Sequence, residues 1–169
     1  FFSSNVIGTA HTLTITGDTE FTGTIDNVPA LDITGDAEFN GAVTNVGVFT
    51  VDGDAVINNT ITATASVEVA GTTDINTTAI TTTGNQTYTG DVTLGADAVL
   101  TANNAGTAQT VRFNGNVDGG GTYSLTINDN AVFGNAAVDN VTGITALEVG
   151  GNANFTSSVT AGGTIEITG

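Results

Sequence analysis

The chain has 169 residues, of which 17 are acidic and only one is lysine or arginine, so its formal net charge is −16. A chain with one such cation cannot neutralise a phosphate backbone or an anionic bilayer surface, and we expect neither nucleic acid nor membrane lipid as a partner. Hydrophobic residues make up 39% and charged residues 11%, which excludes a disordered polyelectrolyte and a helical bundle with a charged surface.

The first residues give two expectations about origin. No apolar run approaches the roughly 18 residues of a membrane span, so we expect no insertion into a bilayer. The sequence opens with Phe1 and Phe2 rather than with an initiator methionine, which favours processing or excision from an exported precursor. Cysteine is absent, so disulfides and thiolate metal sites do not hold the fold. We expect residues 1–12 to form an N-terminal segment whose strand contacts a second subunit.

From residue 13 an 18-residue repeat organises the chain. The residues that open four successive copies are Leu13, Leu31, Phe49 and Val67. A second apolar residue follows two positions later, a glycine four positions later, and further apolar residues eight and twelve positions later. The eighth-position column consists of Phe21, Phe39, Ile57 and Ile75. Alternation of apolar and polar residues between glycine, asparagine and aspartate predicts short strands joined by tight turns.

Beyond residue 79 the spacing becomes irregular. Ile80 is expected to open a copy only 13 residues after Val67, and residues 93–124 show no clean register. The pattern returns at three later openings, Leu125, Leu147 and Ile165. Phe133 and Phe155 stand eight residues into two of these copies, and we predict that they join Phe21 and Phe39 in one buried column.

These columns predict an all-β fold, a parallel β-helix (β-solenoid) with coils of about 18–22 residues that forms one domain over residues 13–169. Identical residue types recur at identical offsets, which stacking of coils requires and a sandwich of hairpins does not. Roughly eight coils spaced about 4.8 Å apart would give a rod on the order of 40 Å long. The glycine column is expected at corners that need a positive φ.

Two segments of the chain carry a family resemblance. TGNQTYTGDVTLGADAVLT (residues 83–101) and FNGNVDGG (113–120) with SLTI (124–127) resemble the repeats of giant secreted bacterial proteins related to filamentous haemagglutinin and autotransporter passengers. The resemblance implies a right-handed parallel β-helix at a cell surface, used for adhesion or for building fibres and sheaths.

Acidic and amide side chains repeat with the coils. Asp18, Asp36 and Asp54 share one column, and stacking would bring like charges close together. Two interpretations stay open: a solvated acidic edge, or a ladder of Ca²⁺ ions that would make these three aspartates metal ligands. In the column nine residues into each copy we expect the asparagines to hydrogen-bond from coil to coil.

We find no catalytic constellation and expect no enzyme. The single histidine, His11, has no identifiable nucleophile and orienting acid for a triad, and is expected at the surface. Solenoid polysaccharide lyases need a lysine or arginine base, and only Arg112 is present. We expect Arg112 to point outward and pair with an acidic neighbour.

The function expected from these features is structural, without a cofactor. The chain would be a subunit or shaft segment of an extracellular or cell-surface filament or adhesin, which assembles head-to-tail with copies of itself through open solenoid ends. The residues expected at the subunit contact are Phe1, Phe2, Val6, Ile7, Ile165 and Ile167. The alternative is a surface module of a larger secreted protein that binds carbohydrate or calcium.

Overall fold

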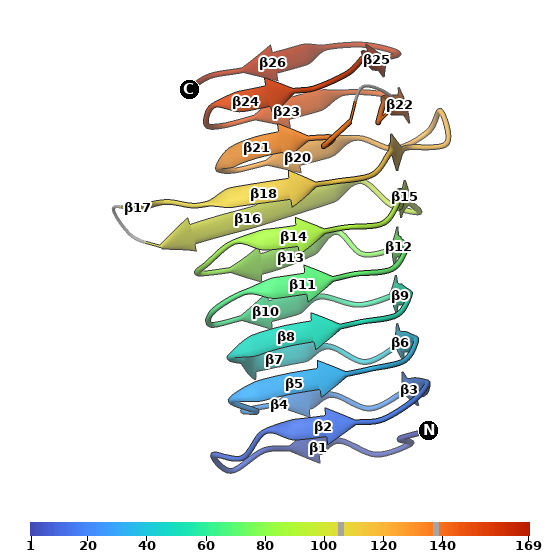
Figure 1. The fold of residues 1–169 in the computed structure, drawn as a ribbon, viewed down its shortest axis with the longest axis vertical. Coiled ribbons are helices and arrows are strands. Elements are labelled where there is room, and N and C mark those ends of the chain that lie inside the picture. The colour runs from blue at the N-terminus through green and yellow to red at the C-terminus, as the bar shows by residue number, and fades with distance from the viewer. Residues whose placement is uncertain (105–106, 137–138) are drawn as a thin grey trace.

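The computed structural model describes residues 1–104, 107–136 and 139–169, and Figure 1 shows them as coils stacked along one axis. Each coil contributes one short strand to each of three parallel sheets, and the described residues contain no helix. The result is a β-solenoid of about 8 turns, so the predicted fold class is confirmed. The N-terminus lies in the first coil and the C-terminus in the last, at opposite ends of the stack (Figure 1).

The three sheets run the length of the solenoid. Sheet 1 has the order β2 (Leu13–Ile15), β5 (Ala30–Ile33), β8 (Val48–Val51), β11 (Val67–Val69), β14 (Gln86–Tyr88), β18 (Thr110–Phe113), β21 (Asn130–Phe133) and β24 (Ala153–Phe155). Sheet 2 has the order β3 (Thr19–Phe21), β6 (Ala37–Phe39), β9 (Ala55–Ile57), β12 (Thr73–Ile75), β15 (Val92–Leu94), β19 (Val117–Asp118), β22 (Val141–Ile144) and β25 (Val159–Ala161). Sheet 3 has the order β1 (Val6–Ile7), β4 (Ile25–Asp26), β7 (Val43–Val46), β10 (Ile61–Ala63), β13 (Ala79–Thr82), β16 (Ala98–Asn104), β20 (Leu125–Ile127), β23 (Leu147–Val149) and β26 (Ile165–Ile167).

Each strand alternates between the interior and the solvent. In β11, Val67 and Val69 are buried and Glu68 is exposed, and this arrangement recurs in most strands. Valine, isoleucine and threonine suit these positions because their branched Cβ favours the pleated backbone. Stacking then places like residues on like, so the core is a set of apolar ladders parallel to the axis.

Two stacks of aromatic rings lie among these ladders. In sheet 2, Phe21 stacks on Phe39 with ring centroids 5.5 Å apart. In sheet 1, Phe113 stacks on Phe133 at 5.3 Å, and Phe133 stacks on Phe155 at 5.0 Å. Phe155 is only half-buried, because it lies in the last coil and has a stacked ring on one side alone.

The 18-residue register of the first four copies is confirmed, and the later register is corrected. Leu13, Leu31, Phe49 and Val67 pair in order along sheet 1. Val67 then pairs with Gln86, not with Ile80, whose partner is Ile61 in sheet 3.

The later openings also belong to sheet 3. Leu125, Leu147 and Ile165 pair with one another there, so Phe133 and Phe155 lie in sheet 1 and not in the column of Phe21. The three sides of a coil share one apolar pattern, and a shift by one side therefore goes unnoticed in the sequence.

Gln86 explains where the sequence register was lost. It takes a fully buried ladder position that is apolar in most other coils, and its amide Nε2 donates to the carbonyl oxygens of Ile80 (3.2 Å) and Thr101 (3.0 Å). The hydroxyl of the buried Tyr88 donates to Gln86 Oε1 at 3.0 Å. Burial raises the pKa of this tyrosine, so it stays protonated as the donor.

One coil is longer than the predicted range. Gln86 pairs with Val111, 25 residues later, because β16 runs beyond the sheet edge and pairs antiparallel with β17 (Thr107–Ala108). Figure 1 shows this excursion projecting sideways from the stack. The flanking coils keep their pairing, so the solenoid accepts an insertion at a corner without a break in its sheets.

The glycine column serves close approach between coils. Gly17 alone has a positive φ among the four glycines of the regular copies, at +97°. At Gly53 and Gly71 an added Cβ would lie under 3.0 Å from backbone atoms of the preceding coil. The expected positive φ is therefore wrong for these two glycines, and lack of space is the reason for glycine.

We expect Gly53→Ala to lower the free energy of unfolding by about 1–3 kcal/mol, because the new methyl group must push two coils apart. Gly162→Ala is the matched control, since its nearest atom would be 3.8 Å away. Urea denaturation followed by circular dichroism measures both changes. Equal stability of the two variants would contradict the close-approach explanation.

Candidate functional site

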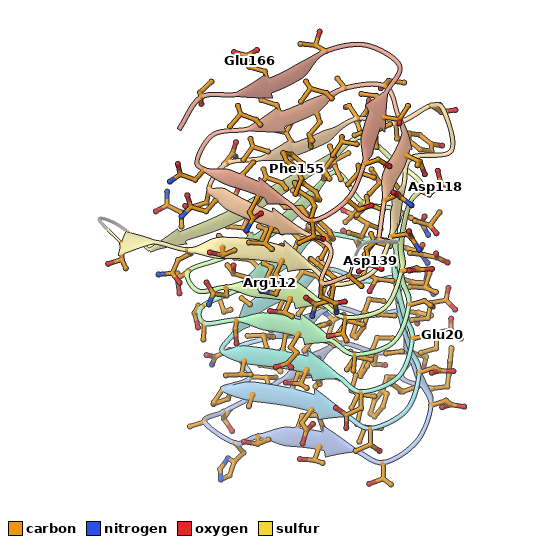
Figure 2. All side chains as sticks on the ribbon, turned by 45° about the horizontal axis from the view of Figure 1, so that its top comes forward. Glu20, Arg112, Asp118, Asp139, Phe155 and Glu166 are labelled. Carbon is orange, nitrogen blue, oxygen red and sulfur yellow. The ribbon has the colours of Figure 1, made fainter. Side chains whose placement is uncertain are left out.

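An acidic hollow is the most distinctive surface feature of the first three coils. It has a volume of ≈ 490 Å³ and lies along the outside of sheet 2 and the corner before it. Its lining residues are Phe1, Asp18, Thr19, Glu20, Asp36, Ala37, Glu38, Asp54 and Val56. Figure 2 shows Glu20 and, further along the stack, Asp118 pointing outward from the same side of the solenoid.

The corner aspartates have a structural role in this hollow. The backbone N–H of Asp36 donates to Asp18 Oδ1 at 3.0 Å, and the N–H of Asp54 donates to Asp36 Oδ1 at 2.8 Å. The N–H of Thr72 donates to Asp54 Oδ1 at 2.7 Å and ends this series. Each carboxylate therefore satisfies a backbone donor of the next coil at a corner where the sheet ladders do not reach.

Asparagine can replace aspartate in this arrangement. The N–H of Asn140 donates to Asn116 Oδ1, and the N–H of Asn152 donates to Asn130 Oδ1, both at 2.9 Å. The acceptor oxygen is what these corners require, and the negative charge is not needed for the bond.

A ladder of amides runs beside the acidic column, as the sequence predicts. Asn58 Nδ2 donates to Asn40 Oδ1 at 2.7 Å, and Asn76 Nδ2 donates to Asn58 Oδ1 at 2.8 Å. The same asparagines also reach the glutamates of the hollow, with Asn40 Nδ2 3.0 Å from Glu20 Oε1. Amide donors thus hold the stacked carboxylates and reduce their mutual repulsion.

The three candidate metal ligands come together at one corner. Asp18, Asp36 and Asp54 all line the hollow, and each uses Oδ1 for a backbone hydrogen bond. Among the described residues no group of three or more histidine, cysteine, aspartate or glutamate side chains has a geometry that could hold a metal ion. Calcium binding stays a prediction for this chain.

The expected subunit-contact residues lie at the two ends of the stack. Phe1, Ile7, Ile165 and Ile167 are large apolar residues that the described structure leaves exposed. Val6 pairs with Ile25 and is half-buried, and Phe2 stacks on Phe21 at 4.8 Å. Within the described chain, the outer edges of β2 and β26 have no strand partner.

Two further carboxylates have environments that the sequence did not reveal. The hydroxyl of Thr44 and the amide of Asn45 donate to Asp26 Oδ1 and lower the pKa of this aspartate. The backbone N–H and the hydroxyl of Ser124 donate to Asp97 Oδ1 and lower the pKa of that aspartate. Neither belongs to the aligned acidic column, so repetition gave no signal for them.

The two remaining basic side chains lie at the surface. His11 is exposed, and its Nδ1 lies 3.1 Å from the carbonyl oxygen of Thr9. Arg112 is exposed on the outer face of sheet 1, and its ladder neighbours are Thr87 and Val132. These neighbours are uncharged, so the acidic partner expected for Arg112 is not beside it in the ladder.

No family model, curated protein or solved structure matches this chain. In the part of the chain that the structure describes, no helix is long and apolar enough to cross a bilayer.

We expect Asp36→Asn to be neutral or stabilising, because its Oδ1 still accepts the Asp54 N–H while one stacked charge is removed. Asp36→Ala removes the acceptor and is expected to cost about 1 kcal/mol. Thermal denaturation of both variants at low salt measures the difference. Equal destabilisation by the two substitutions would show that the charge matters and not the hydrogen bond.

The lowered pKa values of Asp26 and Asp97 predict a loss of stability in acid. Because these pKa values are lower in the folded than in the unfolded chain, the stabilisation is present above the usual value of 3.8 and is lost as pH falls through the folded-state values. We expect Asp97→Asn, which keeps an acceptor and does not titrate, to flatten the dependence of the melting temperature on pH below about pH 4. An unchanged dependence would contradict this assignment.

Proposed function

We propose that this chain is a structural segment of an extracellular or cell-surface β-solenoid, the shaft of a filament or adhesin. The proposal rests on one observation: three parallel sheets continue through every coil that the structure describes, from the first to the last. A rod of this kind holds distance and direction, which is the mechanical task of a shaft. The resemblance of residues 83–101 and 113–120 to haemagglutinin and autotransporter repeats supports the same role.

The proposal extends to assembly of the chain with copies of itself. One apolar ladder of sheet 3 includes Val6 in the first coil and Ile167 in the last, so the chemistry of the two end faces matches. Ile7 and Ile165 are exposed beside them. In a head-to-tail contact, Ile167 of one copy would pair with Val6 of the next, and the main-chain hydrogen bonds of sheet 3 would continue across the junction.

Charge sets the conditions for this contact. Each copy carries a formal charge of −16, so copies repel one another at low ionic strength. Salt screens this repulsion while the burial of apolar end faces still favours contact. Assembly is therefore expected to increase with salt, and lateral surfaces covered by threonine and asparagine keep the rods apart.

We expect the intact chain to form elongated, unbranched assemblies at high protein and salt concentration, and Ile167→Asp to prevent them by placing an unpaired charge in the junction. Thr62→Asp, on the exposed outer face of sheet 3, is the control that adds the same charge without effect on assembly. Sedimentation velocity and electron microscopy measure assembly, and circular dichroism verifies that the coils remain folded. A chain that stays monomeric under these conditions, or equal effects of the two variants, would refute head-to-tail assembly.

The alternative function is a module that binds calcium or carbohydrate. The acidic hollow favours it, because five carboxylates from Asp18, Glu20, Asp36, Glu38 and Asp54 line one open surface. Calorimetric titration with Ca²⁺ distinguishes the two functions. Heat of binding that disappears in a variant lacking Glu20 and Glu38 would favour the module.

A further inference from the structure

The sequence contains four pairs in which glycine follows asparagine or aspartate: Asn40-Gly41, Asp52-Gly53, Asn114-Gly115 and Asp118-Gly119. Such pairs are chemically fragile because glycine has no Cβ to hinder its backbone nitrogen and can adopt backbone conformations closed to other residues. The nitrogen can therefore reach the side-chain carbonyl carbon of the preceding residue. Cyclisation requires that the amide nitrogen is not held by a hydrogen bond and that the side chain can turn.

Three of these glycines are held by the coil below or above. Gly41 N–H donates to the carbonyl oxygen of Phe21 at 3.2 Å, and Gly53 N–H donates to that of Gly35 at 3.3 Å. Gly119 N–H donates to the carbonyl oxygen of Thr142 at 3.0 Å.

The side chain of Asn40 is held as well. Its Nδ2 donates to Glu20 Oε1, and its Oδ1 accepts from Asn58 Nδ2 in the amide ladder at 2.7 Å. The folded structure therefore restrains both groups that would have to react at the Asn40-Gly41 pair.

Asn114-Gly115 differs from the other three pairs. The backbone N–H of Asn114 donates to the carbonyl oxygen of Tyr88 at 2.8 Å, which places the pair at the corner after sheet 1. Within the described residues, the Asn114 side chain and the Gly115 N–H have no hydrogen-bond partner. The equivalent glycines of earlier coils do have one, as in the bond of 3.2 Å from Gly90 N–H to Gly71 O. The pair follows the 25-residue coil, where this corner ladder is interrupted.

We propose that Asn114 is a site of spontaneous deamidation in the folded protein and that Asn40 is protected from it. Hydroxide removes the proton of the Gly115 N–H, and this nitrogen attacks Cγ of Asn114. A bond forms between the Gly115 nitrogen and Cγ, the bond from Cγ to Nδ2 breaks, and ammonia leaves with a proton from water. Water then opens the cyclic imide, and the product is aspartate or isoaspartate at this position. The reaction needs no reagent other than water and hydroxide.

The modification would alter a crowded, charged corner. Asp91 Oδ1 accepts from the backbone N–H of Asn116 at 2.8 Å, and a Cβ on Gly115 would lie 2.6 Å from the same oxygen. A new carboxylate adds like charge beside Asp91, and isoaspartate adds one more atom to the main chain in a corner that cannot accommodate a methyl group. Aged protein is therefore expected to melt at a lower temperature than fresh protein.

The single arginine makes the test direct. Trypsin cleaves the unfolded chain only after Arg112, which separates Asn40 in the fragment 1–112 from Asn114 in the fragment 113–169. The folded protein is incubated at mildly alkaline pH, then unfolded, digested and weighed by mass spectrometry, and isoaspartate is measured in each fragment. We expect the fragment 113–169 to exchange an amide NH2 for OH several-fold faster than the fragment 1–112.

Two controls complete the experiment. In urea the structural protection disappears, and the two fragments should react at comparable rates. Asn114→Gln should abolish the fast mass gain, because the longer side chain forms the ring slowly. Equal rates in the folded protein, faster reaction of the fragment 1–112, or persistence of the gain in Asn114→Gln would each overturn the proposal.

Discussion

In-register stacking of parallel coils is the constraint on which the rest of this structure depends. Every coil must place its strands one sheet spacing, about 4.8 Å, above the strands of the coil before. Backbone groups then find partners only between coils, and each side chain meets the side chain at the same position of its neighbours. Apolar residues form continuous interior ladders, and corners such as Gly53 and Gly71 approach so closely that a Cβ has no room.

The same constraint governs the charged surface. Stacking brings carboxylates of one column together, which is unfavourable unless their oxygens find donors. Asp18, Asp36 and Asp54 accept backbone N–H groups from the next coil, and the asparagine ladder donates to Glu20 and Glu38. Acidity and order are thus compatible in this rod, because most of its negative columns also serve as hydrogen-bond acceptors. The acidic hollow follows from this arrangement and gives the outside of sheet 2 its own chemical character.

The long coil shows how far the constraint can be relaxed. Its extra residues leave at a corner as β16 and β17, while Leu100 still pairs with Ile127 and Phe113 with Phe133. A buried polar group, Gln86 with Tyr88, marks the coil where the insertion begins. Corners that lose their ladder bonds there are also the positions where backbone amides become chemically accessible, which links the insertion to the reactivity inferred for Asn114.

The sequence by itself determined the fold class, the 18-residue coil of the first four copies and the inward position of their apolar residues, because stacking demands the same residue type at each step. It also predicted the asparagine ladder from one recurring column. Only the tertiary structure decided which side of the coil each later segment occupies. Apolar alternation looks the same on all three sheets, and Gln86, a polar residue in a ladder position, hid the continuation of sheet 1. The pairing of Asp26 with Thr44 and of Asp97 with Ser124 was likewise set by the register of the stack, since no residue at either position announces a partner from another coil.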